Sequence, residues 1–549
     1  MSRLIPPPPP PAPGRSLTSD DSAAVSPPPW RDVVHGMPFF HARWDGQHTS
    51  VRGESAVYRS AIPEGIPSHG DPYASWTWDG HSLTITTDAT GFYPLFYFVR
   101  GAEIGISTSL VRLLEEGASR ELDDAALAVL LRFTGMVGED TPFREIRLVP
   151  PGARLTWSRG QLRGEGRYAR PPVTSLSRTE AIDAYIDLIH TAIRRRPPVE
   201  GTVVPLSGGR DSRHLFLALL HVGYRPDACV TMRYFPTIRT NDVDVAGALA
   251  AAAGVPHFVV SQPRNQLRQE RRKDLETHFC AIEHAWIPAM ADFISGRWRT
   301  VYEGVAGDTL STGIFATPER QHLFDAGRFE ELADKFLWPE GYTPSLLSPD
   351  QYRRSSRAVA RERVARELAR HSDAPNPIGS FCFWNRTRRV TSLAPFAILS
   401  AGAHVYCPYL DTDVFTLLAS LPYDMLQNER EYHRFHSDTI SRAYPEYAHV
   451  PYAAKYPVVG RGVGLGHAWQ TSAALLGQLA RVSGTGLLRP GLLGARLAYC
   501  MANPLYTTRV AELASSLSYL THLADFIEPV TEPRAGATVE RTRRPRPVR

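Results

Sequence analysis

Cysteine is scarce in this chain of 549 residues, and none occurs in its first two fifths. The five cysteines are Cys229, Cys280, Cys382, Cys407 and Cys500. Their number is odd, and no two have the close spacing of a zinc site or of a disulfide framework. Reduced thiols in a cytoplasmic protein are therefore expected.

Long apolar runs are also missing. No stretch reaches the roughly 18 apolar residues that a membrane-spanning helix needs, and residues 1–3 lead directly into prolines 6–11 rather than into a signal-peptide core. The net charge is +5, but residues 540–549 alone hold five Arg and one Glu, so the remainder is nearly neutral. We therefore expect no membrane and no nucleic acid as partner.

Composition and periodicity divide the chain into four parts. Residues 1–29 form a Pro-rich leader and residues 531–549 a basic tail, both expected to be disordered. Between 30 and 170, short alternating apolar runs such as Leu83–Thr87 predict a β-rich domain. Residues 175–530 form the second domain, which is mostly helical from about residue 275.

The second domain opens with alternating helices and strands. The pattern Ser177-x-x-Glu180 is a capping box for a helix that runs to Arg196, where two prolines follow. Strands and helices spaced in this way predict a parallel sheet with crossover helices. The predicted elements are the strands Thr202–Leu206, Ala228–Met232 and Phe258–Val260 and the helices Asp211–Val222 and Asp242–Ala253.

Residues 205–212, Pro-Leu-Ser-Gly-Gly-Arg-Asp-Ser, lie between the first of these strands and its helix. The glycines allow the backbone to approach an anion closely, and the hydroxyls and helix N-terminus supply hydrogen-bond donors. An aspartate within such a loop suits a divalent cation shared with phosphate oxygens. The spacing fits neither the Walker loop nor the dinucleotide fingerprint. An ordinary strand-to-helix turn is the alternative.

Further motifs follow in order over roughly residues 80–460, and together they resemble the asparagine synthetase family of the glutamine-hydrolysing type. The matching runs are Asp88-x-x-Gly91-x-x-Pro94-Leu95-Phe96-Tyr97, Thr141-Pro142-Phe143, Pro150-Pro151-Gly152, the 205–212 loop, Gly304-x-x-Gly307-Asp308, Pro408-Tyr409-Leu410-Asp411 and Lys455-Tyr456-Pro457. The resemblance implies an α/β protein. An Ntn-type, glutaminase-like β-rich domain would precede a pyrophosphate-loop ATPase domain, which has a parallel sheet and a largely helical C-terminal part.

The resemblance also implies site residues, with ATP and Mg2+ as cofactors. Asp211 and Asp308 would hold magnesium, and Lys455 would stabilise charge in the adenylation and amide-forming steps. The pyrophosphate would lie on Ser207, Gly208, Gly209 and Ser212, and the adenosine beside Leu206, Met232 and Gly304. The alternatives are a helix cap for Asp308 and a surface position for Lys455. Asp411 is expected to be a helix cap, and His433 and His436 are not expected to bind metal.

Two departures from the family pattern limit what carries over. The family's glutaminase half uses an amino-terminal cysteine as nucleophile, whereas the first cysteine here is Cys229, in the second domain. We infer that the first domain keeps the fold without hydrolysing glutamine. Thr309 stands where the family usually has glutamate, and the glycines before Asp308 are shifted.

The implied function is an ATP-dependent ligase that adenylates a substrate carboxylate, releases pyrophosphate and joins an amine without hydrolysing glutamine. Relatives without glutaminase activity include β-lactam synthetases and lasso-peptide cyclases. Val305 lies where β-lactam synthetases have tyrosine, which favours macrolactam formation on a peptide. Such a peptide would need a leader-binding protein and a protease. An intermolecular amidoligase, an ammonia-dependent asparagine synthetase-like enzyme and a non-catalytic nucleotide-binding scaffold remain alternatives.

Overall fold

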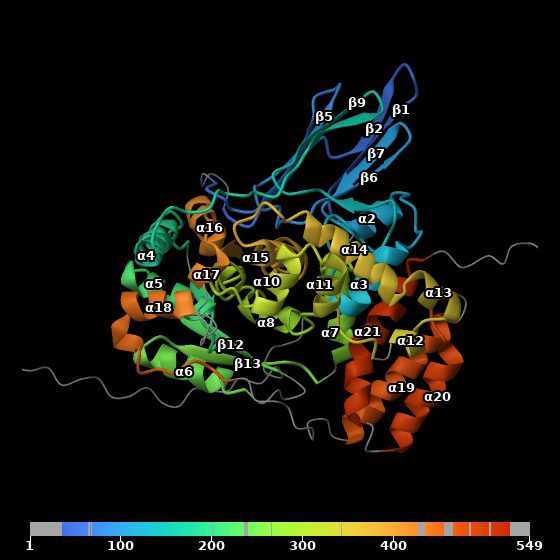
Figure 1. Cartoon of the computed structure of the whole chain (residues 1–549). Helices are drawn as coiled ribbons and strands as arrows, with labels where there is room; N and C mark the ends of the chain where they lie inside the picture. The colour runs from blue at the N-terminus through green and yellow to red at the C-terminus, as the bar shows by residue number, and fades with distance from the viewer. Residues whose placement is uncertain are drawn as a thin grey trace, which may run out of the picture.

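The computed structural model describes residues 36–527, apart from 64–65, 67, 200, 235–239, 265, 342, 427–433, 455–464, 483–484 and 504–506. The leader, the tail, His433 and Lys455 thus lie outside the described residues. The fold is mixed α/β, with two antiparallel sheets, one parallel sheet and many helices (Figure 1). The antiparallel sheets project from a larger body that holds the parallel sheet and most of the helices.

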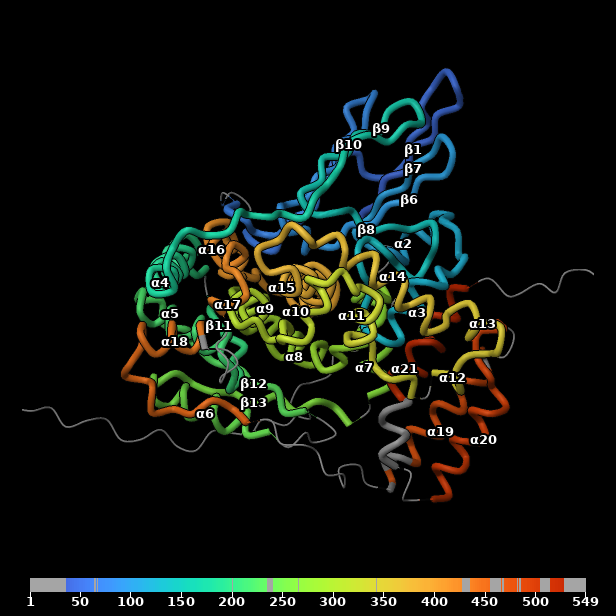
Figure 2. The backbone as a smooth tube through the Cα atoms, in the orientation of Figure 1, coloured from blue at the N-terminus to red at the C-terminus, as the bar shows by residue number. Residues whose placement is uncertain are grey.

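The N-terminal part is a sandwich of two five-stranded sheets, which is visible as two layers in Figure 2. Buried and less buried side chains alternate along the strands, so that each sheet has one buried face. The large side chains Phe40, Trp76 and Trp157 fill the space between the sheets. One sheet has the order β2-β1-β7-β6-β8 and the other β10-β9-β5-β4-β3. The strands are β1 (Phe39–Trp44), β2 (Thr49–Gly53), β3 (Ala56–Ser60), β4 (Tyr73–Trp78), β5 (Leu83–Thr87), β6 (Phe96–Arg100), β7 (Glu103–Ser107), β8 (Arg147–Leu148), β9 (Arg154–Ser158) and β10 (Gln161–Glu165).

The third sheet is entirely parallel, with the order β13-β12-β11-β14-β15. Its first strand, β11, lies in the middle, with β12 on one side and β14 on the other. The order therefore reverses at β11, and open α/β sheets bind ligands beyond the carboxyl ends of their strands at such a reversal. The strands are β11 (Thr202–Pro205), β12 (Ala228–Arg233), β13 (His257–Ser261), β14 (Thr300–Tyr302) and β15 (His404–Tyr406).

The predicted start of this unit is confirmed in detail. Ser177 and Glu180 form both hydrogen bonds of the capping box, and the helix ends at Arg194 rather than Arg196. The strands β14 and β15 are not anticipated by the sequence, because three-residue strands within helical surroundings have no periodicity to detect. Yet β14 leads directly into the segment that carries Asp308.

Helices surround the sheet and make up the C-terminal part, where α19, α20 and α21 pack together and α21 also packs against α7 (Figure 1). No helix among the described residues is both long and apolar enough to cross a bilayer. The longer helices are α3 (Asp124–Phe133), α4 (Arg178–Arg194), α5 (Asp211–His221), α6 (Asp242–Ala252), α7 (Gln266–Glu276), α8 (Ile287–Ile294), α10 (Pro318–Asp325), α11 (Phe329–Phe336), α14 (Arg357–Ala369), α16 (Thr412–Ala419), α18 (Arg434–Ala443), α19 (Leu465–Val482), α20 (Pro490–Ala502) and α21 (Thr507–Ala524). Short ones are α2 (Leu110–Glu115), α9 (Gly307–Ser311), α12 (Thr343–Leu346), α13 (Pro349–Arg354), α15 (Pro377–Cys382) and α17 (Tyr423–Leu426), with a π-helical segment η2 (Phe383–Thr391) and single turns η3 (Ala394–Ile398), η4 (Leu399–Ala401), η5 (Pro408–Leu410) and η6 (Pro445–Tyr447).

Buried arginines fasten the sandwich to the body. Arg388 donates to the carbonyls of Gly91 and Val149 (3.1 and 2.8 Å). Arg196, only 6% exposed, forms a bidentate ion pair with Asp71, both of whose oxygens lie 2.9 Å from Nε. Charged groups removed from water in this way need their partners, because an unpaired buried charge is costly.

Asp71→Asn should therefore destabilise the protein by roughly 3 kcal/mol, since it leaves the Arg196 guanidinium buried without its counter-charge. Urea unfolding, compared with wild type, measures the loss. Asp350→Asn is the matched control, because Asp350 pairs with Arg353 on the surface, where both side chains are more than two thirds exposed, and should cost nothing measurable. Equal effects of the two substitutions would contradict a fastening role for Arg196.

Candidate functional site

The loop between β11 and α5 is tightly hydrogen-bonded. Ser212 Oγ lies 3.0 Å from both the amide nitrogen and the Oγ of Ser207, and the Gly209 amide donates to Ser207 Oγ (3.2 Å). The Gly208 amide donates to the Asp242 carboxylate (2.6 Å). The amides of residues 207–209 are thus engaged within the protein. Arg210, the N-cap of α5, makes no side-chain capping bond, so the first-turn amides of α5 have no side-chain cap.

Gly208 is required by the close approach of a second segment. A Cβ at this position would lie 2.5 Å from Cβ of Ala453, whose amide donates to the Gly208 carbonyl (2.9 Å). The amide of Ala454 donates to the side chain of Asn241 (2.8 Å). The backbone immediately before Lys455 is therefore fixed against the loop. Lys455 itself lies outside the described residues, and its role stays a prediction.

Asp211 and Asp308 come together although 97 positions separate them in the sequence. Asp211 begins α5 after β11, and Asp308 lies in the first turn of α9 after β14, the strand paired with β11. Gly304 and Gly307 allow this approach, since a Cβ on Gly307 would lie 2.9 Å from Cγ of Asp211, and one on Gly304 3.1 Å from the amide nitrogen of Ser212. The sheet order thus places both carboxylates at the same edge.

This pair is electrostatically costly. Burial, and then the neighbouring charge of Asp308, raise the pKa of Asp211 well above its ordinary value, and the Asp308 amide partly offsets them. Oδ1 of Asp211 is buried and accepts no hydrogen bond from the described residues. Two hard carboxylates, one with an unused oxygen, form a donor set that fits a divalent cation such as Mg2+.

Asp308 does not cap α9, which removes the alternative reading of this residue. The N-cap is Ala306, which has a left-handed backbone (φ 77°) that is uncommon outside glycine. Oδ1 of Asp308 accepts from the amide and hydroxyl of Thr309 (2.6 and 3.1 Å), and that hydroxyl also contacts Thr387 (2.8 Å). Thr309 thus orients the Asp308 carboxylate.

Leu206 and Met232 lie at the carboxyl ends of β11 and β12 and are 2% and 3% exposed. The Leu206 amide donates to the Val230 carbonyl (2.9 Å), which continues the sheet beyond β11. With Gly304 they line the same edge as Asp211, and contact with adenosine stays a prediction. Asp411 is confirmed as the N-cap of α16, since its side chain accepts from the Asp413 amide (3.1 Å).

Four residues at this edge were not singled out from the sequence as site residues. Tyr409 Oη donates to the Asp211 carbonyl (2.9 Å), and Arg210 lies with its guanidinium 4.3 Å from the Tyr452 ring. Glu303 follows β14, and burial raises its pKa to about 7. His436, expected to lie on the surface or in the core, is fully buried, with Nδ1 3.5 Å from Oδ1 of Asp211. The sequence shows only motifs and their spacing. It does not identify these four residues, because none of their contacts is local in sequence.

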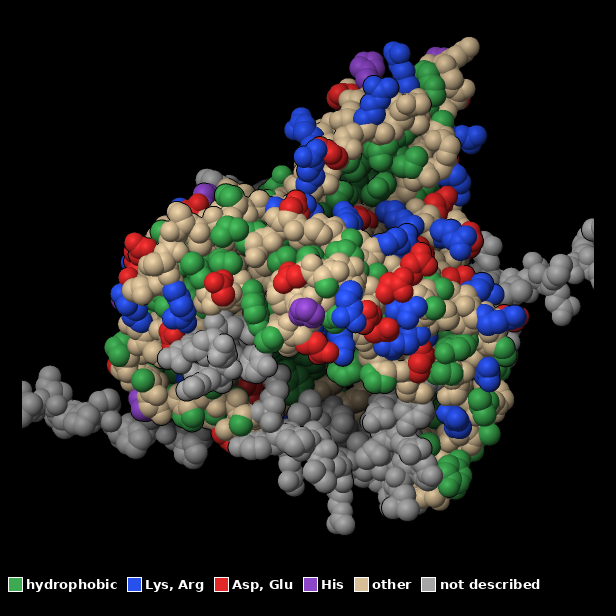
Figure 3. Space-filling model, viewed as in Figure 1, with side chains coloured by type: hydrophobic (Ala, Val, Ile, Leu, Met, Phe, Trp, Pro, Cys, Tyr) green, Lys and Arg blue, Asp and Glu red, His purple; other side chains and the backbone are tan. Residues whose placement is uncertain are grey.

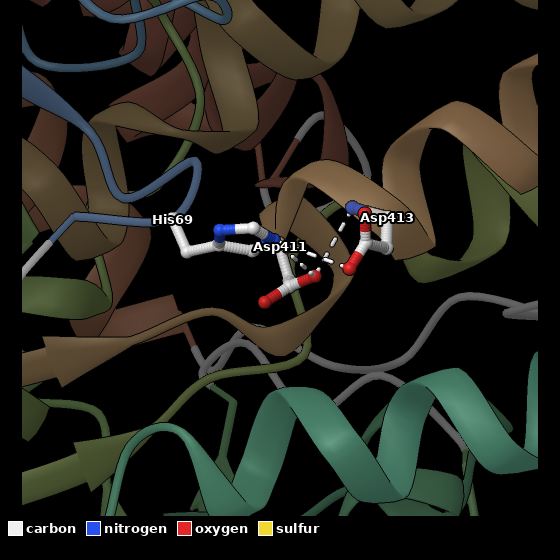
Figure 4. A group of neighbouring side chains, drawn as sticks. All are labelled: His69, Asp411 and Asp413. Carbon is white, nitrogen blue, oxygen red and sulfur yellow. Dashed lines mark hydrogen bonds and ion pairs between the residues drawn. The ribbon is translucent and has the colours of Figure 1, made fainter.

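His69, Asp411 and Asp413 form a second cluster of possible metal ligands (Figure 4). His69 Nε2 lies 3.2 Å from Oδ2 of Asp413 and 3.9 Å from Oδ1 of Asp411. Arg195 already neutralises both carboxylates, at 3.0 Å from Asp411 and 2.8 Å from Asp413. The cluster is therefore an ion-pair network that ties the 69–71 segment to the start of α16.

A groove of about 640 Å3 lies between the sandwich and α14. Its charged side chains are paired, for example Arg363 with Asp140 (2.7 Å) and Arg370 with Glu139 (3.4 Å). On the face drawn in Figure 3, acidic and basic side chains are likewise interspersed. The groove has no surplus of one charge with which to select a ligand, so the edge at Asp211 and Asp308 is the stronger candidate.

Comparisons with known proteins give little further information. No protein-family model matches the chain, and no curated protein matches it. Among solved structures it is similar to a glutamine phosphoribosylpyrophosphate amidotransferase from B. subtilis complexed with ADP and GMP (13% identity, 44% of each chain, TM-score 0.13). It is also similar to an NMN synthetase from Francisella tularensis (14% identity, 52% of this chain and 100% of that one, TM-score 0.19).

A third similar structure is an allosteric regulatory enzyme of purine biosynthesis (13% identity, 46% of this chain and 44% of that one, TM-score 0.13). The match spans less than half of the amidotransferase and of the purine-biosynthesis enzyme. Likenesses this weak do not establish a shared fold or activity, so the functional argument rests on the geometry of the site.

Asp211→Asn should stabilise the metal-free protein at neutral pH by at least about 1 kcal/mol, since one pKa unit corresponds to about 1.4 kcal/mol. A carboxyl whose pKa is raised on folding costs stability above its unfolded pKa, and the asparagine amide does not ionise. The advantage should therefore shrink as pH falls toward the ordinary carboxyl pKa. Thermal unfolding in chelator at pH 8 and pH 5 measures it.

Asp413→Asn provides a control with the opposite sign, because Arg195 holds the pKa of Asp413 below its ordinary value. That substitution should lower stability at neutral pH. A lower melting temperature for Asp211→Asn than for wild type would show that the buried pair is not under electrostatic strain.

Proposed function

We propose that the protein is an ATP-dependent ligase that forms amide bonds through an adenylated carboxylate. The observation that carries the proposal is the meeting of Asp211 and Asp308 beside the glycine loop, at the reversal point of the parallel sheet. Each carboxylate is acceptor-only, and together they destabilise the site unless a cation lies between them. A Mg2+ ion held there would neutralise charge on the triphosphate of ATP.

In the first step, a substrate carboxylate oxygen attacks the α-phosphorus of ATP. The bond between that phosphorus and the oxygen bridging to the β-phosphate breaks, and pyrophosphate leaves with the electron pair. In the second step, an amine attacks the acyl carbon, AMP leaves, and the nitrogen gives up a proton. The chain's own contributions would be the uncapped amides of α5, Arg210 beside the loop, and Lys455, which follows Ala453 and Ala454 in the sequence.

The narrower proposal is macrolactam formation, in which the carboxylate and the amine belong to one peptide. The absence of a cysteine before Cys229 supports an amine source other than glutamine hydrolysis, and Val305 argues against a β-lactam synthetase-like site. A leader-binding protein and a protease would then be partners. Intermolecular ligation, asparagine formation from ammonia and a non-catalytic scaffold are the competing possibilities.

The deciding experiment incubates the purified full chain with α-labelled ATP, magnesium and a fraction of low-mass peptides and metabolites. AMP and pyrophosphate should form, and Asp211→Asn and Asp308→Asn should lower the rate by at least about 100-fold, because each removes a ligand charge that stabilises the transition state. ADP as product, or full activity in both variants, would contradict adenylation. A product lighter than its precursor by one water indicates ring formation, and a heavier, joined product indicates intermolecular ligation.

Glu303 supplies a separate prediction for the second step. Its carboxyl lies at the same edge, and its negative charge acts on both Asp211 and Tyr234. With a pKa of about 7, it is poised to accept the proton that the attacking amine gives up. The base must be deprotonated, so the rate of amide formation should rise as pH increases through about 7 and then level off.

Glu303→Gln should remove this rise and slow amide formation by about 100-fold, while pyrophosphate exchange into ATP continues. Stopped assays with a fixed amine, read by mass spectrometry, compare the two half-reactions. Equal loss of exchange and amide formation would place Glu303 in the first step instead.

A further inference from the structure

A line of buried hydrogen bonds runs beneath the two carboxylates and connects three helices. His214 of α5 contacts His436 of α18, with Nδ1 and Nε2 3.1 Å apart. His436 Nδ1 lies 2.8 Å from Ser311 Oγ of α9, and Ser311 Oγ donates to the Gly307 carbonyl (2.6 Å). The side chains of His214, His436 and Ser311 are all inaccessible to solvent.

If both histidines are neutral, one set of donors and acceptors fits the bonds in this line. The Ser311 hydroxyl has one proton, which it uses in the hydrogen bond to the Gly307 carbonyl. Its oxygen therefore accepts the hydrogen bond from His436 Nδ1–H. The Nε2 of a neutral His436 then carries a lone pair and accepts from His214 Nδ1–H. The last nitrogen, His214 Nε2, is left as an acceptor, and it has no hydrogen-bond partner among the described residues. One neutral tautomer of each histidine is compatible with these hydrogen bonds.

The His436 Nδ1–H also lies near the site itself, 3.5 Å from Oδ1 of Asp211. Gly307, whose carbonyl accepts the hydrogen bond from Ser311, is the residue before Asp308. The rings of Tyr185 and Tyr409 lie edge-on to His436, at centroid distances of 5.9 and 6.2 Å. The line therefore joins the first turn of α5 to the first turn of α9 through a packed, buried contact.

The next two residues of α18 extend this contact to the surrounding helices. Ser437 Oγ accepts from Arg210 Nε (2.7 Å), and Arg210 is the N-cap of α5. Asp438 accepts from Arg178 of α4 (2.7 Å). Three consecutive residues of α18 thus contact α9, the start of α5 and α4. These contacts hold α18 against α5, the helix that follows the 205–212 loop.

We propose that His436, acting through Ser311, is a positioning residue that sets the separation of Asp211 and Asp308 and so determines how tightly the pair binds a divalent cation with nucleotide. The inference rests on the proposed function. Groups that orient metal ligands without touching the metal commonly control affinity in this way. The effect should fall on cation binding, because His436 contacts α5, which begins with Asp211, and α9, which carries Asp308.

Ser311→Ala tests this with the smallest change, the loss of one oxygen. Mn2+ binding to the full chain is measured by electron paramagnetic resonance, in the presence of an ATP analogue with methylene between the α- and β-phosphorus atoms. The Mn2+ dissociation constant should rise about tenfold. Ser392→Ala is the matched control, since Ser392 is equally buried and its Oγ also donates to the carbonyl four residues earlier, that of Arg388. It should bind Mn2+ as wild type does.

Two substitutions of His436 separate its two nitrogens. His436→Asn keeps an N–H group near the Nδ1 position and should bind Mn2+ more tightly than His436→Gln, whose amide reaches the Nε2 position instead. His371→Gln is their control, because His371 is also inaccessible to solvent and also contacts a serine hydroxyl, that of Ser380 (2.9 Å). If the His436 variants do not fold, Ser311→Ala and Ser392→Ala decide the question.

The outcomes distinguish this inference from the function on which it rests. Tight Mn2+ binding by wild type that Ser311→Ala leaves unchanged overturns the positioning role alone. Equal weakening in Ser311→Ala and Ser392→Ala also overturns it, because the effect would then be general loosening. Absence of Mn2+ and nucleotide binding in wild type overturns both.

Discussion

Two carboxylates held together at the end of the parallel sheet are the constraint on which the rest of the site depends. The Asp211 side chain is partly shielded from water, and this burial together with the neighbouring charge of Asp308 raises its pKa. Several features nevertheless hold them together: adjacent strands β11 and β14, glycines at 304 and 307, and a left-handed backbone at Ala306. Strain of this kind persists only where the surrounding structure enforces it, and it clusters at functional sites. Under the proposed function, a divalent cation bound between the carboxylates would turn the same repulsion into affinity.

The sandwich contributes to this site through contacts rather than through chemistry of its own. Its 69–71 segment is tied to the helical body by the ion pair of Asp71 with Arg196 and by His69, which contacts Asp413 (Figure 4). Arg195 joins the same network through Asp411 and Asp413. Two residues before Asp411, Tyr409 donates to the Asp211 carbonyl, and its ring closes against Gly307. The ion pairs of Asp411 are therefore only two residues along the chain from Tyr409, which contacts Asp211. These contacts give the sandwich a structural role next to the carboxylate pair.

Much of the fold was predictable because its signals are local. A few consecutive residues are enough to identify each of three features: the capping box of α4, the strands β11 to β13 and the glycine loop. The strands β14 and β15 were not predictable, since a run of three residues is too short to show an alternating apolar pattern. Among the site residues, Asp211 and Asp308 were chosen from motifs, but their contact depends on sheet order. His436 was read as an ordinary surface or core residue, because its partners Ser311 and His214 lie 125 and 222 positions away. Lys455 lies outside the described residues.

A crystal structure of the full chain with Mg2+ and a nucleotide analogue that resists cleavage between the α- and β-phosphates tests the central claim most directly. The account predicts one metal ion in contact with carboxylate oxygens of both Asp211 and Asp308, and with phosphate oxygens of a nucleotide whose triphosphate lies against residues 207–212. A metal ion bound instead at His69, Asp411 and Asp413, or a nucleotide bound away from the carboxyl edge of β11, would contradict it.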